Sequence, residues 1–297
     1  MIVVAWLGLG AMGFPMAGHL SHLPGIEVKV FNRSPEKSAK WLAAYPGSLA
    51  STPANAADGA DYVFACVGND NDVREVTTGT AGAFAAMKPG AVFVDHTTAS
   101  ATVARDLALV AEKSGLAFLD APVSGGEAGA KAGTLTVMVG GDAGALARAE
   151  PLIASYGRMI RRMGPSGSGQ LAKMANQIAI AGLIQGLAEA ITFAERAGLD
   201  IEALMSTISK GAAQSWQMEN RWKTMHDRTF DFGFAVEWMR KDLAICADEA
   251  DRNGANIAVT KLIDTYYAEI QNMGGNRWDT SSLIVRLNGK TSGDGSA

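Results

Sequence analysis

The sequence predicts an α/β fold in which an N-terminal Rossmann domain, with a doubly wound and mostly parallel sheet, precedes an all-helical C-terminal domain. The chain opens with an apolar strand pattern that runs into a glycine loop. Short apolar segments then alternate with amphipathic helical segments as far as residue 163, a pattern typical of an open parallel sheet covered by helices. After the Pro-Ser-Gly-Ser-Gly break at 165–169, only helical periodicities remain.

Composition limits the function classes. The chain has 297 residues, of which 48% are hydrophobic and 19% charged, so it can form two domains with a large core. Its net charge of −4 gives no electrostatic footprint for nucleic acid or an anionic membrane. No uninterrupted apolar run is long enough to span a bilayer, and the N-terminus lacks the basic start of a secretory signal. We expect a cytoplasmic protein in which Cys66 and Cys246 are free thiols.

The expected elements follow from apolar periodicity. Strands are expected at 2–7, 28–31, 62–66, 92–95, 117–119 and 135–139, with helices such as 36–44 and 101–114 between them. Later helices are expected at 170–197, 201–210, 216–225, 236–253, 256–273 and 280–288. The first of these is rich in Ala and Gly on nearly all sides, so other helices should surround it, and Gly198 fits its C-cap.

These elements suggest a cofactor domain at 1–163, a domain for substrate binding and oligomerisation at 164–290, and a flexible Gly/Ser-rich tail at 291–297. A cleft between the two domains is expected to hold the site.

The glycine loop is the first functional candidate. It has the pattern G-x-G-x-x-G and comprises Gly8, Leu9, Gly10, Ala11, Met12 and Gly13. In a dinucleotide site the first glycine permits a tight turn, the second lets pyrophosphate approach the main chain, and the third lets helix and strand pack closely. The helix N-terminus adds backbone N–H groups and a positive dipole. An ordinary strand–helix turn is the alternative, but the position directly after a strand favours the cofactor site.

The end of the second strand indicates which dinucleotide binds. An NAD site usually places Asp or Glu there, on the ribose 2′-hydroxyl, whereas this chain has Asn32, Arg33 and Ser34. A guanidinium forms bidentate hydrogen bonds with a 2′-phosphate, and small polar side chains add donors. We therefore predict NADP(H) in preference to NAD(H). The alternative is a solvated arginine ahead of the helix that begins at Pro35.

Familiar nucleophile and metal motifs are absent from the sequence. It has no G-x-S-x-G, no H-E-x-x-H and no Tyr followed four residues later by Lys. His19 and His22 could share a helix face, but they lack a third ligand, so no metal is expected. His96 lies just past a strand end, where packing against the cofactor is a sufficient explanation.

A lysine is the remaining candidate for acid–base chemistry. Lys173, Asn176 and Gln177 lie on one side of a mostly apolar helix. A buried lysine is costly unless it has a partner or a task. As an ammonium group it could protonate a carbonyl oxygen while hydride arrives from nicotinamide. The alternative is a lysine that snorkels to solvent at a helix start.

A second polar segment, residues 120–126, follows an expected strand. It reads Asp-Ala-Pro-Val-Ser-Gly-Gly, and the consecutive N–H groups of Ser124, Gly125 and Gly126 could form an anion-binding nest. Ligands of open α/β sheets bind beyond the carboxyl ends of strands, so this nest would suit a small substrate with a carboxylate. A plain glycine turn is the alternative.

Four segments together resemble one family. They are residues 8–17, residues 120–126, residues 167–173 (Gly-Ser-Gly-Gln-Leu-Ala-Lys) and residues 241–243 (Lys-Asp-Leu). With these in order along nearly its whole length, the chain resembles the β-hydroxyacid dehydrogenases, which include 3-hydroxyisobutyrate dehydrogenase and tartronate semialdehyde reductase. The resemblance implies metal-free, reversible hydride transfer between NADP(H) and a short 3-hydroxy acid or its semialdehyde.

The resemblance also implies roles for single residues. Lys173 would be the general acid/base, and Ser124, Gly125 and Gly126 would bind the substrate carboxylate. The residues expected beside the cofactor are Cys66, Val67, Gly68, Thr97 and Lys241.

Two features of the substrate site stay open. Many members carry Asn four residues after the lysine, whereas here Asn176 lies three after it and Gln177 four after it. Either amide could contact substrate. Trp216 is expected in the substrate pocket, and Phe232, Phe234 and Trp238 are further candidates, although aromatic residues at such spacing also build cores.

Two rival functions are an imine reductase and a non-catalytic cofactor-binding module. Imine reductases generally place another residue at the position of Lys173, and the non-catalytic relatives have lost the lysine, which is present here. The apolar helix at 170–197 further suggests a homodimer or homotetramer.

Overall fold

The computed structural model describes residues 1–287 and divides into two compact units, residues 1–173 and residues 174–297. The boundary expected from the sequence, between residues 163 and 164, thus lies ahead of the one found. The difference arises because the first turns of the helix that follows are hydrogen-bonded to the sheet of the first unit. The tail expected at 291–297 lies outside the described residues.

The first unit is built on a nine-stranded sheet with the order β3-β2-β1-β4-β5-β6-β8-β7, in which β9 also pairs with β8. Its strands are β1 (Ile2–Leu7), β2 (Ile26–Phe31), β3 (Ser48–Leu49), β4 (Tyr62–Ala65), β5 (Val92–Asp95), β6 (Ala117–Asp120), β7 (Val123–Ser124), β8 (Leu135–Gly141) and β9 (Gly157–Gly164). All pairs from β3 to β6 are parallel, whereas β8 runs antiparallel to β6 and β7. The doubly wound, mostly parallel sheet predicted from the sequence is confirmed.

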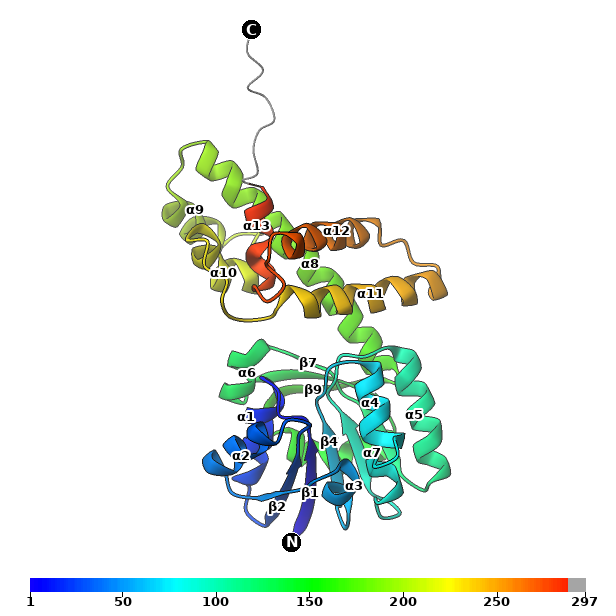
Figure 1. Ribbon diagram of the computed structural model, residues 1–297. Coiled ribbons are helices and arrows are strands. Elements are labelled where there is room, and N and C mark those ends of the chain that lie inside the picture. Colours follow the sequence, from blue (N-terminus) through cyan, green and yellow to red (C-terminus); the bar gives the residue numbers. More distant parts are fainter. Residues whose placement is uncertain (288–297) are drawn as a thin grey trace. The chain divides into compact units, whose positions relative to one another are not determined.

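Helices cover both faces of this sheet (Figure 1). They are α1 (Gly13–Ser21), α2 (Pro35–Ala44), α3 (Pro53–Ala57), α4 (Asp70–Thr78), η1 (Ala83–Ala85), α5 (Ala101–Lys113), α6 (Gly126–Ala132) and α7 (Ala143–Ile153). Successive residues of β1 point to opposite faces. Val4 and Trp6 belong to the core under α1, α2 and α7, whereas Ala5 and Leu7 belong to the core under α3, α4 and α5.

The six strands expected from the sequence all form, with ends that differ by two residues or fewer. Three strands were not foreseen. β3 and β7 have two residues each, too few for a periodicity. β9 carries arginines and exposed methionines, because it forms hydrogen bonds with β8 only and has little apolar surface to bury.

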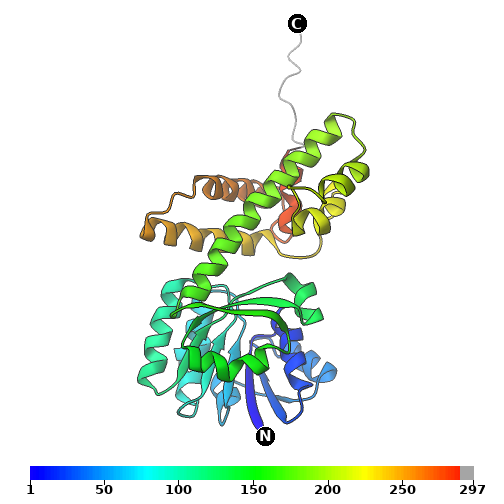
Figure 2. The same ribbon diagram turned by 180° about the vertical axis from the view of Figure 1, so that it is seen from behind.

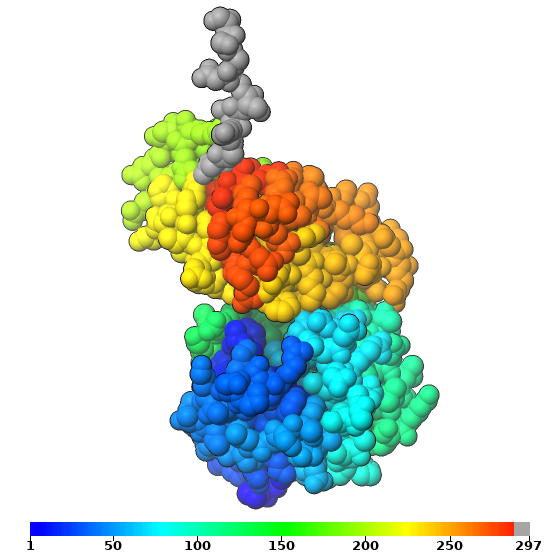
Figure 3. Space-filling view, in the orientation of Figure 1, coloured from blue at the N-terminus to red at the C-terminus, as the bar shows by residue number. Residues whose placement is uncertain are grey.

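The described part of the second unit, residues 174–287, is helical, as expected. Its elements are the part of α8 (Ser168–Arg196) that follows residue 173, then α9 (Ile201–Ile208), α10 (Trp216–His226), α11 (Val236–Asn253), α12 (Ala258–Asn272), η2 (Thr280–Ser282) and α13 (Leu283–Arg286). The continuous helix expected at 280–288 is instead a 3-10 turn followed by one short α-helical turn, and residue 288 lies outside the described residues. On the face shown in Figure 3, the orange and red segments from α11 to α13 form much of the surface of this unit.

The α8 helix runs unbroken for 29 residues (Figure 2). Its residues from Ala181 to Ala194 pack into a core with α9 to α13. Gly198, expected as its C-cap, has φ +72°, a conformation that glycine adopts without strain.

By length and composition alone, α8 could cross a membrane. An eighteen-residue window has a mean hydropathy of 1.4, and half of that window is buried. No such segment was expected from the sequence, because polar residues interrupt every apolar run of this length. In α8 these polar residues are few, so the mean hydropathy of the window stays high. Core helices of proteins without any membrane contact pass the same test, so this finding assigns no membrane location.

Candidate functional site

Five strands of the first unit end in register at one edge of the sheet. Leu7 pairs with Phe31 on one side and with Ala65 on the other, and the same row continues to Asp95 and Asp120. Because these strands are parallel, the loops that follow β1, β2, β4, β5 and β6 leave the sheet at the same edge. The structure therefore gathers the predicted cofactor residues of the first unit from segments that are far apart in the sequence.

The glycine loop has the geometry that an anionic cofactor needs. Gly8 has φ +100°, and a Cβ there would lie 2.3 Å from the carbonyl oxygen of Cys66. A Cβ on Gly13 would lie 2.1 Å from the oxygen of Gly8, so helix and loop are in direct contact. Gly10 faces open space, which leaves its main chain accessible. The α1 helix has no side-chain cap and no acidic residue in its first turn, so its N-terminus fits a pyrophosphate.

The residues after β2 divide into a loop anchor and an exposed cation. Asn32 accepts a hydrogen bond from the Leu9 N–H at 2.9 Å and donates one to the Ser34 carbonyl at 3.1 Å. Its amide thus fixes the glycine loop against the end of β2. The Arg33 side chain is 88% exposed and forms an ion pair with Asp72 at 3.3 Å. Arg33 and Ser34 are both exposed, and of the three residues Arg33 alone carries a charge.

Thr97 connects the loops after β4 and β5. Its side-chain oxygen accepts a hydrogen bond from the Val67 N–H at 3.0 Å, and its own N–H donates to Asp95 at 2.9 Å. Thr97 is almost fully buried. The residue predicted beside the cofactor therefore fixes the Cys66–Val67–Gly68 loop through the main chain of Val67.

Asp95 is a buried carboxyl group at the end of β5. One oxygen accepts the Thr97 N–H, and the other has no hydrogen-bond partner among the described residues. Burial raises the pKa of Asp95 to about 7, against the favourable hydrogen bonds from Thr97.

Asp95→Asn is expected to stabilise the protein at alkaline pH. The carboxyl has a higher pKa in the folded state than the 3.8 of the unfolded chain, so its contribution to stability is greatest below pH 3.8 and declines as pH rises through about 7. Thermal unfolding at pH 5 and pH 8 should show that the variant's gain in Tm over the wild type grows with pH. A gain that is equal at both pH values, or larger at pH 5, would contradict the assignment.

His96 lies in the core and contributes no charge at neutral pH. Its Nδ1 lies 2.6 Å from the Ala121 carbonyl, and its Nε2 lies 2.8 Å from the Tyr156 hydroxyl. The ring stacks on Trp6 and Phe64. Burial lowers the pKa of His96 to about 4. The ring thus packs against core side chains on one face of the sheet, and its Nδ1 contacts the main chain of Ala121, directly after β6.

Asp120 anchors the N-terminus of α8. One carboxylate oxygen accepts the Gly167 N–H at 2.8 Å, and the other accepts the Gln170 N–H at 3.0 Å. The contact is close because Gly169 lacks a side chain, since a Cβ there would lie 2.3 Å from the Asp120 main-chain oxygen. Burial raises the pKa of Asp120 to about 6, although these hydrogen bonds oppose the shift.

Lys173 lies on the next turn of the same helix and is the last residue of the first unit. It is 7% exposed. The alternative of a lysine that snorkels to solvent does not fit this degree of burial.

The residues predicted to bind a carboxylate lie at the end of β7 and in the turn that follows it. Ser124 ends β7, which pairs with β8, and Gly125 and Gly126 follow with φ +132° and +64°. Glycine adopts both of these positive φ values without strain. Successive N–H groups in such a turn can form an anion-binding nest.

The predicted residues of the second unit form their own polar cluster. Gln177 donates to Asp242 at 2.6 Å and accepts from Asn176 at 2.8 Å, and Lys241 forms an ion pair with Asp242 at 3.2 Å. Both ends of the Gln177 amide are thus engaged within the protein, and the side chain is almost fully buried. Asn176 is more exposed than Gln177.

Trp216 begins α10 and is about half exposed. The guanidinium of Arg221 lies over its ring at 4.8 Å and over that of Phe232 at 5.1 Å. Phe232, Phe234 and Trp238 are also partly exposed, so none of the four predicted aromatic residues is a core residue.

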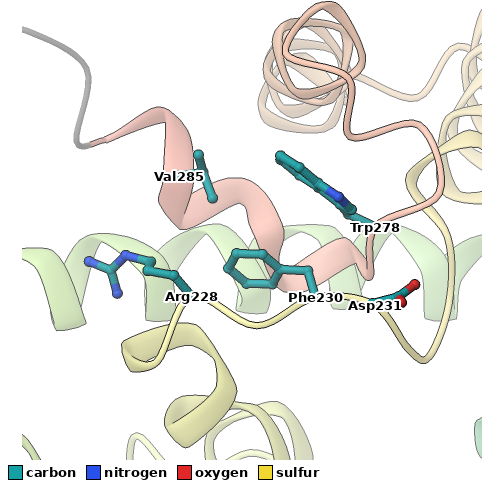
Figure 4. Close-up of a pocket in the computed structure, with 5 residues that line it drawn as sticks. All are labelled: Arg228, Phe230, Asp231, Trp278 and Val285. Atoms are coloured by element: carbon teal, nitrogen blue, oxygen red, sulfur yellow. The ribbon is translucent and has the colours of Figure 1, made fainter.

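A cavity of about 380 Å³ opens elsewhere in the second unit. Figure 4 shows residues that line it, with Phe230 between Arg228 and Trp278 in this view and Val285 on α13. None of the predicted site residues lines it. Among residues 1–287, no group of three or more His, Cys, Asp or Glu could hold a metal, and Cys66 and Cys246 form no disulfide.

Three polar residues were not assigned from the sequence alone: Asp120, Gln170 and Asp242. All three are buried and make hydrogen bonds to segments distant in the chain. All three lie inside the segments that carry the family resemblance, and that position was the one feature of the sequence that could have indicated their importance.

The chain matches two family profiles that together span nearly all of it. Residues 3–164 match the NAD binding domain of 6-phosphogluconate dehydrogenase, and residues 167–287 match a domain described as the NAD-binding domain of NADP-dependent 3-hydroxyisobutyrate dehydrogenase.

Individual relatives agree with these profiles. An oxidoreductase of Shewanella frigidimarina is 56% identical over 97% of this chain and 98% of its own. The NAD-dependent L-serine dehydrogenase of Pseudomonas aeruginosa is 34% identical over 98% of this chain and 99% of its own. The solved structure of Mycobacterium tuberculosis 3-hydroxyisobutyrate dehydrogenase with L-serine has a TM-score of 0.87 at 32% identity, covering 97% of this chain and 99% of that one.

The imine reductases are more distant. A Pseudomonas imine reductase has a TM-score of 0.59 at 21% identity, over 97% of this chain and 99% of that one. Such a likeness extends to the fold only.

Proposed function

This chain belongs to the β-hydroxyacid dehydrogenase family of NAD(P)-dependent oxidoreductases, and from that membership we propose that it transfers a hydride between NADP(H) and a short 3-hydroxy acid or its semialdehyde. Lys173 is the general acid/base of this reaction. A cyclic imine is not the preferred substrate, since the imine reductases share the fold alone.

The observation that carries the proposal is the position of Lys173. Its helix begins on the Asp120 carboxylate, at the sheet edge where the glycine loop and the Val67 loop also lie. The ammonium group therefore belongs to the same compact unit as the glycine loop, Thr97 and the predicted carboxylate residues. A general acid must be held within hydrogen-bond reach of the oxygen that it protonates, and the hydrogen bonds of this unit hold the helix of Lys173 in a fixed position.

When bound, the nicotinamide ring supplies or accepts the hydride. The N-terminus of α1 and the open main chain at Gly10 would hold the pyrophosphate. We assign the preference for NADP(H) to Arg33, which can reach a ribose 2′-phosphate because its side chain is exposed. Asn32 contributes indirectly, by fixing the glycine loop through the Leu9 N–H.

The substrate is oriented by its carboxylate. The N–H groups of Ser124, Gly125 and Gly126 and the Ser124 hydroxyl would hold that group, which leaves the reacting carbon at a set distance from the loop. In the reductive direction Lys173 donates a proton to the carbonyl oxygen, and in the oxidative direction it accepts the proton of the hydroxyl. Of the two amides, Asn176 is the better candidate for a substrate contact, because it is less buried than Gln177, whose amide is engaged at both ends.

A substrate panel tests this function. We expect NADPH consumption with the semialdehyde of a short 3-hydroxy acid, such as tartronate semialdehyde, and NADP⁺ reduction with 3-hydroxyisobutyrate or L-serine. Methylglyoxal, which has no carboxylate, should be a poor substrate, and a cyclic imine should not react. A preference for the imine would support an imine reductase instead, and binding of NADPH without turnover of any compound would support a non-catalytic module.

We also propose that the protein forms a homodimer or homotetramer through α8. Leu183 is 43% exposed and Phe193 is 74% exposed on this helix, and apolar side chains of this size favour contact with another copy. Light scattering measures the mass in solution.

A further inference from the structure

Gln170 lies one helical turn before Lys173, and its side chain is completely buried. Its Oε1 accepts a hydrogen bond from the Ala99 N–H at 3.1 Å, and its Nε2 donates one to the Thr97 carbonyl at 2.7 Å. One amide thus forms hydrogen bonds with two main-chain groups of the loop between β5 and α5. To satisfy both groups, a side chain must offer an acceptor and a donor together, which a primary amide does at any pH.

The loop that Gln170 binds is also joined to the cofactor side of the site. The Thr97 side-chain oxygen accepts the Val67 N–H at 3.0 Å, in the loop that follows β4. A continuous set of hydrogen bonds therefore runs from the helix of Lys173, through Thr97, to the loop predicted beside the cofactor.

The backbone of the same helical turn is fixed independently. Asp120 accepts the N–H groups of Gly167 and Gln170, and Gly169 leaves no space between the helix and the end of β6. With the main chain held by Asp120 and the side chain held at Thr97, this turn has little freedom to rotate or slide along the sheet edge.

We infer that Gln170 is a positioning residue for the reaction: it sets the place of Lys173 relative to the cofactor loop. The inference rests on the proposed function of Lys173. Gln170 itself touches neither substrate nor cofactor, and it acts through the helix turn and Thr97. A misplacement of about 1 Å in reacting groups can cost on the order of 100-fold in rate, so loss of the Gln170 hydrogen bonds should lower turnover more than it lowers binding.

Gln170→Met tests the inference, because methionine has a similar length and keeps neither hydrogen bond. With NADP⁺ and 3-hydroxyisobutyrate we expect kcat to fall roughly 10-fold to 100-fold. The dissociation constant of NADPH, from fluorescence titration, should stay within about threefold of the wild-type value, since the bond between Thr97 and Val67 remains. The matched control is Gln185→Met, another buried glutamine of α8, which should leave kcat unchanged.

Gln170→Glu separates positioning from simple packing. When protonated, the introduced carboxyl can still accept from the Ala99 N–H and donate to the Thr97 carbonyl, whereas the ionised form would place two acceptors together. It would be as completely buried as Gln170, and burial disfavours the ionised form of a carboxyl, so its pKa should lie above the ordinary value. We expect this variant to recover much of the activity that Gln170→Met loses, and to lose it as pH rises.

Two results would overturn the inference. One is a folded Gln170→Met variant with wild-type kcat, and the other is a Gln170→Glu variant whose activity follows the wild-type pH profile, a measurement that also serves if the methionine variant does not fold. Failure of the proposed function would look different, because Lys173→Ala would then retain turnover. If that variant is inactive while the Gln170 variants behave as the wild type, only the positioning role is wrong.

Discussion

Lys173→Ala is expected to lower turnover by about two orders of magnitude or more, the usual scale for loss of a general acid. The ammonium group donates its proton to the carbonyl oxygen in the transition state, and alanine offers nothing in its place. Steady-state kcat in both directions measures the effect. NADPH should still bind with about wild-type affinity, because the residues that would hold the pyrophosphate lie in the loop between β1 and α1.

Lys173→Arg is the matched control for charge. Arginine keeps the positive charge at this position but does not release a proton at ordinary pH. If proton transfer is the role of Lys173, the arginine variant should be nearly as slow as the alanine variant. Substantial turnover in Lys173→Arg would indicate that charge alone suffices, and near-normal turnover in Lys173→Ala would refute the mechanism.

Much of the fold could be predicted because the strands of a parallel sheet are buried on both faces and appear in the sequence as short apolar runs. Residues 2–7 and 92–95 are such runs, and both strands form with the expected bounds. β9 could not be found in this way, since an edge strand with exposed arginines and methionines has no apolar pattern to detect. The family profiles divide the chain close to the predicted boundary, whereas the first compact unit extends to residue 173, because Gly169 and Gln170 at the start of α8 pack on the sheet.

Candidate site residues could be proposed from the sequence where they occur in short linear segments. The glycine loop, the Ser124–Gly126 turn and Lys173 each lie in a recognisable segment. The function of Asp120 as an anchor for α8 depends instead on contacts with residues 47 and 50 positions later in the chain. Asn32 is a comparable case: its type suggested a donor to the cofactor, whereas its side chain is bonded to Leu9 and Ser34. Such pairings depend on how the loops fold together, which spacing along the chain does not encode.

Arg33→Asp is expected to change the cofactor preference of the protein. The Arg33 side chain is almost fully in solvent, and its ion pair with Asp72 is exposed, so that pair contributes little and can be exchanged for a better one. A 2′-phosphate is a better partner, because a guanidinium binds it through two parallel hydrogen bonds between charged groups. An aspartate at position 33 would remove these bonds and repel the phosphate.

Initial rates with NADPH and with NADH measure this change. In Arg33→Asp the KM for NADPH should rise roughly 10-fold to 100-fold, the scale of losing hydrogen bonds between charged groups, while the KM for NADH should change by less than about threefold. Asp72→Asn is the matched control, since it removes the exposed ion pair but leaves the guanidinium available to the phosphate. That variant should bind NADPH at least as well as the wild type. Equal losses for both cofactors in Arg33→Asp would mean that Arg33 does not distinguish them, and that it is a solvated residue at the start of α2.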